Sequence, residues 1–540
     1  MKNLKFQSVF DIIGPVMVGP SSSHTAGALA IAKMARNLCA QPPARVTFTL
    51  YGSFAHTGSG HGTDKALVAG MLGFDACDLE IRDSFSIARD RGLDVEFVRE
   101  TRRDADHPNT VDIVMEEPDA TRLEVRGVSV GGGAAVITRI DGIDVDVTGE
   151  HTSVVIRQRD ERGVLAHIAS CIAERGVNIA TTRMYRTRRG ATAYTVMETD
   201  DAIPPQVRSL IAEHESILDV RVIPAMNRIA ASAPALDEAS AEERFDAFDF
   251  TSGAELIALC AAEKCSIAHA YRMREEALCA LDGRGAGIDE YLDRVLSIME
   301  ASATEPADAP LRSTGGLIGG EAKALRDAAD DDGSSSLLDA LSSDAVAFAL
   351  AVLETNAAMG RIVAAPTAGS AGGGPAVLLA LAKHRDIPRD TLREGLLTAA
   401  AVGHLIARNA SVSGAEGGCQ AEVGSAAGMA AAAAVAMTGG TASQALDAAS
   451  NALTCLMGLV CDPVGGLVEI PCQKRNATAA LTALASAQIA LAGVANLVGF
   501  DETVAAMDAV GRTLPFELRE SALGGIAATP SACAWCAGRG

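Results

Sequence analysis

The spacing of apolar residues changes once along this 540-residue chain, and that change limits what the chain can fold into. Up to residue 224, runs with the two-residue period of strands alternate with runs of helical period. After residue 248 the apolar runs have the 3.6-residue period of helices and are separated by glycine-rich loops. The sequence therefore predicts a multidomain α+β protein whose last part, 248–540, is an all-α domain.

The part before residue 248 divides into three stretches. Residues 1–150 mix helix-like and strand-like runs and predict an α+β domain. Residues 152–224 follow the order strand, helix, strand, strand, helix, strand, which is the βαββαβ order of ferredoxin-like domains. The stretch 225–247 is rich in Ala, Glu and Ser, and we expect a linker there.

The charge balance excludes some classes of partner. With 46 Lys+Arg against 68 Asp+Glu the net charge is −22, so neither a nucleic acid nor an anionic membrane is an expected partner. The long apolar run 479–500 is mostly Ala with polar residues inside, and we expect a buried helix there. The N-terminal apolar run is interrupted by Asp11 and a Gly-Pro pair, which a signal peptide would not contain. We expect a cytoplasmic protein with reduced cysteines.

The cysteines fall into different surroundings. Cys39, Cys171, Cys260 and Cys279 lie in helical runs, as small core residues do. Cys419, Cys461 and Cys472 instead lie in loops dense with Gly and Pro, where thiolates from different loops can meet at one metal site. None of them belongs to a C-x-x-C pair, so their spacing leaves both a metal site and ordinary core positions open. Cys533 and Cys536 do form such a pair, but no second pair completes a zinc site.

Several polar clusters could line a site for a small anionic ligand. The hydroxyl groups of a serine run precede an apparent helix start, where they can cap the helix or bind a carboxylate. His61 lies between two glycines, which leaves room for it to act as an acid or base. Glycine-rich loops at 365–375 and 315–323 are further candidates. The candidate residues of these clusters are Ser21, Ser22, Ser23, His24, His61, Thr367, Ser370 and Lys323.

Five of these segments together resemble one enzyme family. GPSSSHTAGA, YGSFAHTGSGHGTDKA, APTAGSAGGGPA, SGAEGGCQAEVGSA and CDPVGGLVEIPCQKRNA occur in this order. They are similar to the motifs of iron–sulfur-dependent L-serine dehydratases. The resemblance covers nearly the whole chain, with a β-type domain at 1–150 and an α-type catalytic domain at 248–540. Residues 152–224 resemble an ACT domain, a regulatory module that binds amino acids.

The resemblance implies a reaction and a cofactor. Cys419, Cys461 and Cys472 would hold a [4Fe–4S] cluster whose fourth iron binds L-serine as a Lewis acid, with no pyridoxal phosphate. β-Elimination would then give pyruvate and ammonia, with His61 as the base that removes the α-proton. The serine run, His24, Thr367 and Ser370 would contact the substrate, and Lys323 is a weaker candidate. Cys533 or Cys536 would be the fourth cluster ligand when no substrate is bound.

The ACT resemblance implies an effector and an oligomer. The effector would bind at Gly163, Val164, Leu165, Asn178 and Ile179. ACT modules commonly pair edge to edge, so we expect a homodimer or a larger assembly. A ferredoxin-like module used only for dimer packing is the alternative.

Other functions remain open on the sequence alone. The same chemistry on L-threonine or L-cysteine is the nearest alternative, since one methyl group discriminates by only about 1–3 kcal/mol. A pyridoxal-phosphate dehydratase is disfavoured because the chain has no Ser-x-Lys-x-Arg-Gly-like segment. A non-catalytic amino-acid sensor would leave the loop cysteines and the His61 segment unexplained.

Overall fold

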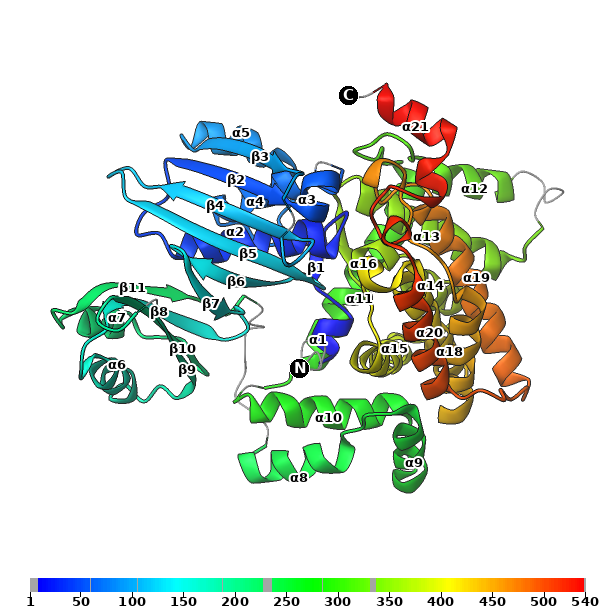
Figure 1. Ribbon diagram of the computed structural model, residues 1–540. Helices are drawn as coiled ribbons and strands as arrows, with labels where there is room; N and C mark the ends of the chain where they lie inside the picture. Colours follow the sequence, from blue (N-terminus) through cyan, green and yellow to red (C-terminus); the bar gives the residue numbers. More distant parts are fainter. Residues whose placement is uncertain are drawn as a thin grey trace. The chain divides into compact units, whose positions relative to one another are not determined.

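The structure is a computed structural model that describes residues 8–58, 60–103, 105–186, 188–226, 236–283, 285–330 and 337–538. These residues form two compact units (Figure 1). The helical unit comprises the described residues of Met1–Ser22 and Ala231–Gly540, and the β-rich unit those of Ser23–Ala230. The predicted change from a β-rich part to a helical part is confirmed. The helices in these ranges include none with both the length and the apolar character that crossing a bilayer requires.

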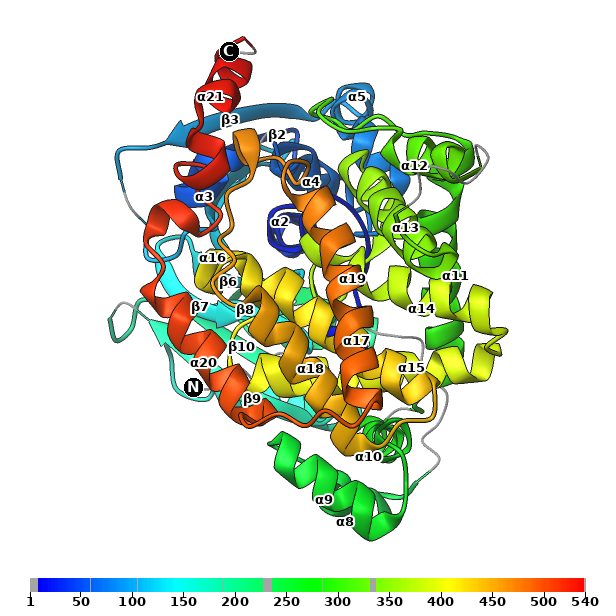
Figure 2. The same ribbon diagram turned by 90° about the vertical axis from the view of Figure 1, so that its right-hand side faces the viewer.

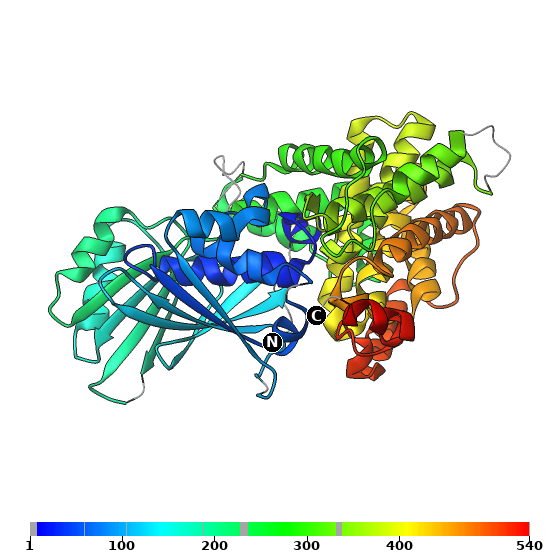
Figure 3. The ribbon, with the colours of Figure 1, turned by 90° about the horizontal axis from the view of Figure 1, so that it is seen from above.

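The first part of the β-rich unit is a six-stranded sheet with helices on one face (Figure 3). Only the pairing of β2 with β3 is parallel, and the other neighbours are antiparallel. The strands in spatial order are β3 (Asp94–Glu100), β2 (Arg45–Tyr51), β4 (Thr110–Glu116), β5 (Arg122–Gly131), β6 (Ala134–Ile140) and β7 (Ile143–Val147). The helices are α2 (Ala28–Asn37), α3 (Gly52–Thr57), α4 (Thr63–Leu72) and α5 (Ser84–Asp90), and the apolar side of α2 packs on β5, β6 and α4.

The second part of the β-rich unit has the predicted βαββαβ order. Its antiparallel sheet has the strand order β11-β8-β10-β9, and the helices α6 and α7 cover one face. Val154 and Ile156 point from β8 into this core, where they meet Ile168 and Ile172 of α6. The elements are β8 (Thr152–Arg159), α6 (Val164–Ala173), β9 (Ile179–Arg186), β10 (Thr192–Thr199), α7 (Pro205–Ala212) and β11 (Ile217–Ile223).

The helical unit is built around α17 (Ser425–Met437), whose residues are buried except Ala436. Helices α14, α15, α18 and α19 surround it (Figure 2). Alanine at most positions of α17 lets these neighbours approach closely, because the distance between packed helices follows the size of the side chains between them. The other helices are α1 (Val9–Ile12), α8 (Glu238–Phe248), α9 (Gly253–Glu263), α10 (Ile267–Leu281), α11 (Ile288–Asp308), α12 (Glu321–Asp330), α13 (Ala340–Ala357), α14 (Gly373–Arg385), α15 (Arg389–Asn409), α16 (Gly414–Gly417), α18 (Ala442–Leu456), α19 (Cys472–Leu491), α20 (Phe500–Thr513) and α21 (Pro530–Ala537).

The structure corrects the expected domain of residues 1–150 at its beginning. The first described residues belong to the helical unit, where β1 (Val16–Val18) pairs with β12 (Arg361–Val363). The helical unit is therefore not all-α. This pairing has no local pattern in the sequence, because each strand has only three residues and the partners are far apart along the chain.

A buried carboxylate fixes the start of this N-terminal segment. Glu275 on α10 is fully buried and accepts hydrogen bonds from the Ser8 hydroxyl at 2.6 Å and the Val9 amide at 2.9 Å. Arg274 forms an ion pair with Glu275 at 2.7 Å and with Asp249 at 2.7 Å. The N-terminal segment is thus held by the helical unit before it reaches Ser22.

The structure also differs from the expected linker at 225–247. Within 225–247, the residues from Glu238 onward form α8, which packs on α10. Asp237 caps the helix by accepting a hydrogen bond from the Ser240 amide, and the ring of Phe245 lies 5.2 Å from the Arg274 guanidinium carbon. Only Ala241 of α8 is fully buried, so the helix needs few apolar residues. Its composition is therefore polar, like that of a linker.

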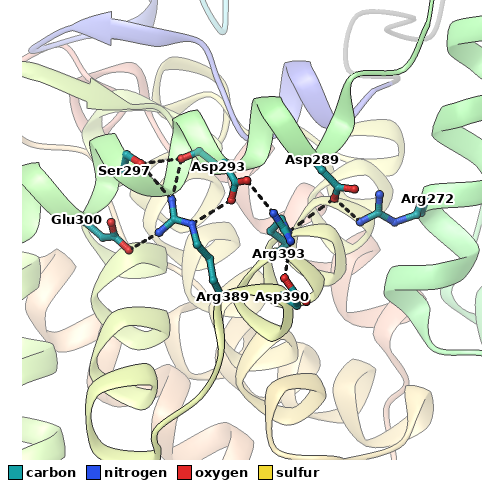
Figure 4. A network of polar contacts seen from close by, with 8 residues as sticks. All are labelled: Arg272, Asp289, Asp293, Ser297, Glu300, Arg389, Asp390 and Arg393. Carbon is teal, nitrogen blue, oxygen red and sulfur yellow. Dashed lines mark hydrogen bonds and ion pairs between the residues drawn. The ribbon is translucent and has the colours of Figure 1, made fainter.

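An ion-pair network joins α15 to α11 (Figure 4). Arg389 forms ion pairs with Asp293 at 3.0 Å and Glu300 at 2.9 Å, and Arg393 forms one with Asp293 at 2.7 Å. The two arginines hold the pKa of the Asp293 carboxyl below its usual value, mainly through the hydrogen bond from Arg389. Because the side chains are partly exposed, salt screens these pairs.

Replacing Arg389 tests this network. We expect Arg389→Ala to lower the melting temperature by about 2–4 °C at low ionic strength, since several charges lose one shared partner. Circular dichroism at 222 nm reports the melting of helices. The difference from the unsubstituted protein should shrink in 1 M NaCl; an equal difference at both salt concentrations would contradict an electrostatic cause.

Candidate functional site

Three buried cysteines of the helical unit come from three different segments. Cys419 directly precedes the π-helical turn η4 (Gln420–Gly424), which continues into α17, and Cys472 is the first residue of α19. Cys461 lies in an extended segment after α18, where its amide donates to the Leu518 carbonyl at 2.9 Å and its carbonyl accepts from the Glu520 amide at 2.8 Å. The late segment around residue 519 therefore fixes the backbone of Cys461.

Two of the three thiols lie beside one carboxylate, and the third is within their electrostatic reach. The sulfurs of Cys419 and Cys461 and one oxygen of Glu422 lie within 4.8 Å of one another. The two thiols are hydrogen-bonded, and the charges of Cys419 and Glu422 also reach Cys472. All three cysteines are free thiols. Cys419 and Cys461 thus lie together, Cys472 lies within electrostatic reach of Cys419, and the convergence of all three on one metal site stays a prediction.

The electrostatics of this cluster suit a cation. The hydrogen bond with Cys419 and burial raise the pKa of the Cys461 thiol well above its usual value, and burial does the same for Cys472. Burial also raises the pKa of the Glu422 carboxyl. The positive charge of Arg475 acts in the opposite direction on Cys472, but this guanidinium is already paired with Asp462 at 2.7 Å. Soft sulfur donors crowded with negative charge are relieved by a bound metal, so the residues fit a metal centre.

The predicted hydroxyl loop lies next to these thiols. The hydroxyls of Thr367 and Ser370 are 3.0 Å apart, and Thr367 is also hydrogen-bonded to Glu422. Asn476 on α19 donates to the Gly369 carbonyl at 2.9 Å and to the Cys472 carbonyl at 3.0 Å. One amide side chain therefore joins the loop to a cysteine of the cluster.

The N-terminal serine run is divided between the two units. In the helical unit, the buried Ser22 hydroxyl accepts a hydrogen bond from the Ala368 amide at 2.8 Å, and Ser21 is also buried. Ser23 and His24 belong to the β-rich unit. The structure thus joins Ser22 to the hydroxyl loop.

The β-rich unit places two buried histidines beside each other. The rings of His24 and His61 are 4.5 Å apart, centroid to centroid. His24 lies within hydrogen-bond distance of the Ser23 hydroxyl at 3.0 Å and the Ser53 hydroxyl at 2.9 Å, and the Thr25 hydroxyl donates to the His61 carbonyl at 2.8 Å. These contacts fix the positions of both histidines.

His61 has the properties of a neutral base. Burial lowers its pKa to about 4, and burial together with the charge of His61 lowers the pKa of His24. Within the described part of the chain, neither ring nitrogen of His61 has a hydrogen-bond partner. An imidazole that is neutral and unpaired at pH 7 can accept a proton from a ligand.

Lys323 does not share the surroundings of the loop residues. Its ammonium forms an ion pair with Asp327 on the same helix, α12, and 42% of its side chain is exposed. The glycine-rich turn before it is filled by the chain's own Glu469. That carboxylate accepts from the Ser313 hydroxyl at 2.6 Å, the Gly315 amide at 2.7 Å and the Leu317 amide at 2.9 Å. Through Glu469, this turn thus holds the segment that leads to Cys472 in place.

The C-terminal cysteine pair lies on α21. The Cys533 thiol is exposed and lies 3.9 Å from the Ala527 carbonyl oxygen. The Cys536 sulfur and the ring of Trp535 lie against Gly465, in the loop that follows Cys461. These contacts leave the predicted role of the pair as a fourth ligand untested.

The residues expected to bind an effector lie at two turns of the βαββαβ part. Gly163, with φ of +91°, precedes α6, and a side chain would be strained in this left-handed conformation. Val164 is buried and Leu165 is 40% exposed. The side-chain amide of Asn178 donates to the Asp200 carboxylate at 2.6 Å, and Ile179 begins β9.

Comparison with known proteins identifies the family. The family model of the serine dehydratase alpha chain matches residues 211–527, and that of the serine dehydratase beta chain matches residues 8–91. The chain belongs to the serine dehydratase family. The alpha and beta models match different parts of the one chain.

Relatives of this family occur both as separate chains and as one chain. The probable L-serine dehydratase alpha chain of Bacillus subtilis is 48% identical over 45% of this chain and 80% of its own length. The probable beta chain of the same organism is 38% identical over 41% of this chain and 99% of its own. The L-serine dehydratase of Helicobacter pylori is 28% identical over 98% of this chain and 99% of its own.

Some residues of this serine dehydratase site were not predicted as such from the sequence. Glu422, Asn476 and Glu469 lie within the family motifs, but the motif pattern gives their residue types no particular role. Glu422 follows Cys419 by three residues and Asn476 follows Cys472 by four. This helical spacing, which puts a polar side chain on the same face as a cysteine, is the signal that could have found Glu422 and Asn476.

Removing the Glu469 carboxylate should destabilise the helical unit. Glu469→Ala leaves one hydroxyl and two amide donors without their acceptor, and we expect the free energy of unfolding to fall by about 3 kcal/mol. Urea denaturation followed by circular dichroism measures this loss. The matched control is Glu416→Ala, which removes an exposed carboxylate on α16. Equal losses of unfolding free energy in both variants would show that the hydrogen bonds of Glu469 do not stabilise the helical unit.

Proposed function

We propose that this chain is an L-serine dehydratase that converts L-serine into pyruvate and ammonia. The observation that carries the proposal is the pairing of Cys419 and Cys461, with Cys472 in electrostatic reach, beside a hydroxyl-bearing loop in a member of the serine dehydratase family. Relatives matched over nearly their whole length are named L-serine dehydratase. Because such an enzyme works with reduced thiols, we also propose a cytoplasmic location.

The three cysteines would hold a [4Fe–4S] cluster. When bound, such a cluster supplies a Lewis acid that neutralises negative charge on the substrate carboxylate and on the departing hydroxyl. Arg475 and the helix N-termini that begin near Cys419 and at Cys472 favour negative ligands nearby. Cys533 or Cys536 as a further ligand in the absence of substrate stays a prediction.

The side chains of this chain would hold the substrate and move its protons. Ser22, Thr367 and Ser370 offer hydroxyl groups that can bind the carboxylate or the hydroxyl of L-serine. His61 would take the α-proton at a ring nitrogen, since burial keeps the imidazole neutral. Loss of the α-proton and of the β-hydroxyl leaves aminoacrylate, which tautomerises and is hydrolysed to pyruvate and ammonia.

We further propose that residues 152–224 are an ACT domain that binds an amino-acid effector and pairs with a second copy. The βαββαβ order and the glycine turn before α6 support this assignment. L-Threonine is the alternative substrate, because the site would have to exclude a single methyl group.

The cluster is tested by anaerobic reconstitution with iron and sulfide. We expect about four iron atoms per chain, a brown colour, and oxygen-sensitive pyruvate release from L-serine without added pyridoxal phosphate. Cys419→Ser, Cys461→Ser and Cys472→Ser should each lose iron and activity because each removes a thiolate ligand. Cys260→Ser, which changes a buried cysteine of α9, is the matched control and should keep both. Activity that survives air and a chelator would contradict the cluster mechanism.

The base is tested by His61→Asn. We expect kcat to fall by about 10²- to 10⁴-fold, the usual contribution of a positioned base, while iron content and visible absorbance stay unchanged. His151→Asn changes an exposed histidine of the same unit and should leave turnover as it was. Loss of iron in His61→Asn would indicate a structural role instead.

A further inference from the structure

Glu422 lies between the sulfur cluster and the hydroxyl loop, and the proposed mechanism gives it no task. One of its carboxylate oxygens is within 4.8 Å of the sulfurs of both Cys419 and Cys461. On its other side, a Cβ atom built on Gly369 would be 3.6 Å from Oε1, and the carboxylate is hydrogen-bonded to Thr367. The side chain is only partly buried.

The chain closes tightly over this carboxylate at one point. A Cβ atom on Gly414 would lie 2.5 Å from Glu422 Oε2 and 3.3 Å from the Cys461 sulfur. A side chain at position 414 would therefore displace the Glu422 carboxylate. The position of the carboxylate is therefore set by the backbone of the cysteine motif.

Glu422 has no cationic partner within the described residues. Its polar contacts are the Thr367 hydroxyl and the Cys461 thiol, whose sulfur is 4.0 Å away. Arg475, the cation that acts on the thiols, is held by Asp462 and by the Val460 carbonyl at 2.8 Å. A Cys461 that binds metal is a thiolate and no longer donates a hydrogen bond, which leaves the carboxylate with one hydroxyl donor. A positive partner stabilises a desolvated carboxylate in its ionised form.

We propose that Glu422 binds the α-ammonium group of the substrate and thereby selects α-amino acids over hydroxy acids that lack an amino group. This inference rests on the proposed function. An ammonium group brings three donors and a positive charge, so it supplies what the carboxylate lacks. An analogue without the amino group leaves the carboxylate unpaired, and the site rejects it for that reason. Thr367, bonded to the same carboxylate, orients it toward the loop.

The test compares L-serine with 3-hydroxypropionate, which is L-serine without its amino group. The reconstituted holoenzyme, Glu422→Gln, Glu422→Asp and the control Glu416→Gln are assayed for KM and kcat on L-serine and for the inhibition constant of 3-hydroxypropionate. We expect Glu422→Gln to raise the KM of L-serine by about 10- to 100-fold, the usual value of a hydrogen bond to a charged group. The inhibition constant of 3-hydroxypropionate should stay the same or fall. Glu422→Asp should give a KM between those of Glu422→Gln and the unsubstituted enzyme. Glu416→Gln should behave as the unsubstituted enzyme.

Iron content and visible absorbance of each variant separate substrate binding from cluster binding. Unchanged iron with a lost preference for L-serine supports the inference. Unchanged iron with the preference intact overturns it, and so does loss of iron in Glu422→Gln, which would make the residue a cluster support. Failure of the proposed function shows earlier, as an unsubstituted holoenzyme that neither turns over L-serine nor is inhibited by 3-hydroxypropionate, and that result overturns both.

Discussion

The close packing of small residues around α17 is the constraint on which the rest of the helical unit depends. Because α17 is mostly alanine, α15, α18 and α19 pack directly on its backbone. Close helices bring their connecting loops together, and the N-terminal ends of α17 and α19 carry Cys419 and Cys472 to the same place. Larger side chains in α17 would separate these ends. Helix packing therefore places Cys419 beside Cys461 and within electrostatic reach of Cys472, although the cysteines are far apart in sequence.

Charge explains why this meeting point is built for a cation. The hydrogen bond with Cys419 and burial raise the pKa of Cys461, burial raises the pKa values of Cys472 and Glu422, and groups of like charge add to the shifts of the two thiols. Such a cluster costs folding free energy when its groups ionise, and Arg475 offsets only part of it because Asp462 shares that guanidinium. The chain therefore keeps an arrangement that is unfavourable by itself, as functional sites often do.

The sequence was sufficient for the elements with a strong local signal. The βαββαβ part could be predicted because each strand and helix has its own period and its own turn, such as the one at Gly163. The loop cysteines could be separated from core cysteines by their Gly- and Pro-rich neighbours. The pairing of β1 with β12 could not be predicted, because two three-residue strands far apart in sequence have no local pattern. Helix α8 was mistaken for a linker because its composition is polar and it buries little.

Side-chain roles within the glycine-rich motifs could not be read from the motifs themselves. The turn before Lys323 and the loop at 365–375 look alike in sequence, since both combine glycine with polar residues. In the structure, the Glu469 carboxylate accepts hydrogen bonds from the backbone amides of the first turn. Asn476 and Ser22 instead bind the backbone of the second loop, and its Thr367 hydroxyl contacts Glu422. The difference arises from which buried acid the fold brings to each loop. A glycine-rich loop therefore indicates a ligand site only where the chain's own carboxylates do not occupy its backbone amides.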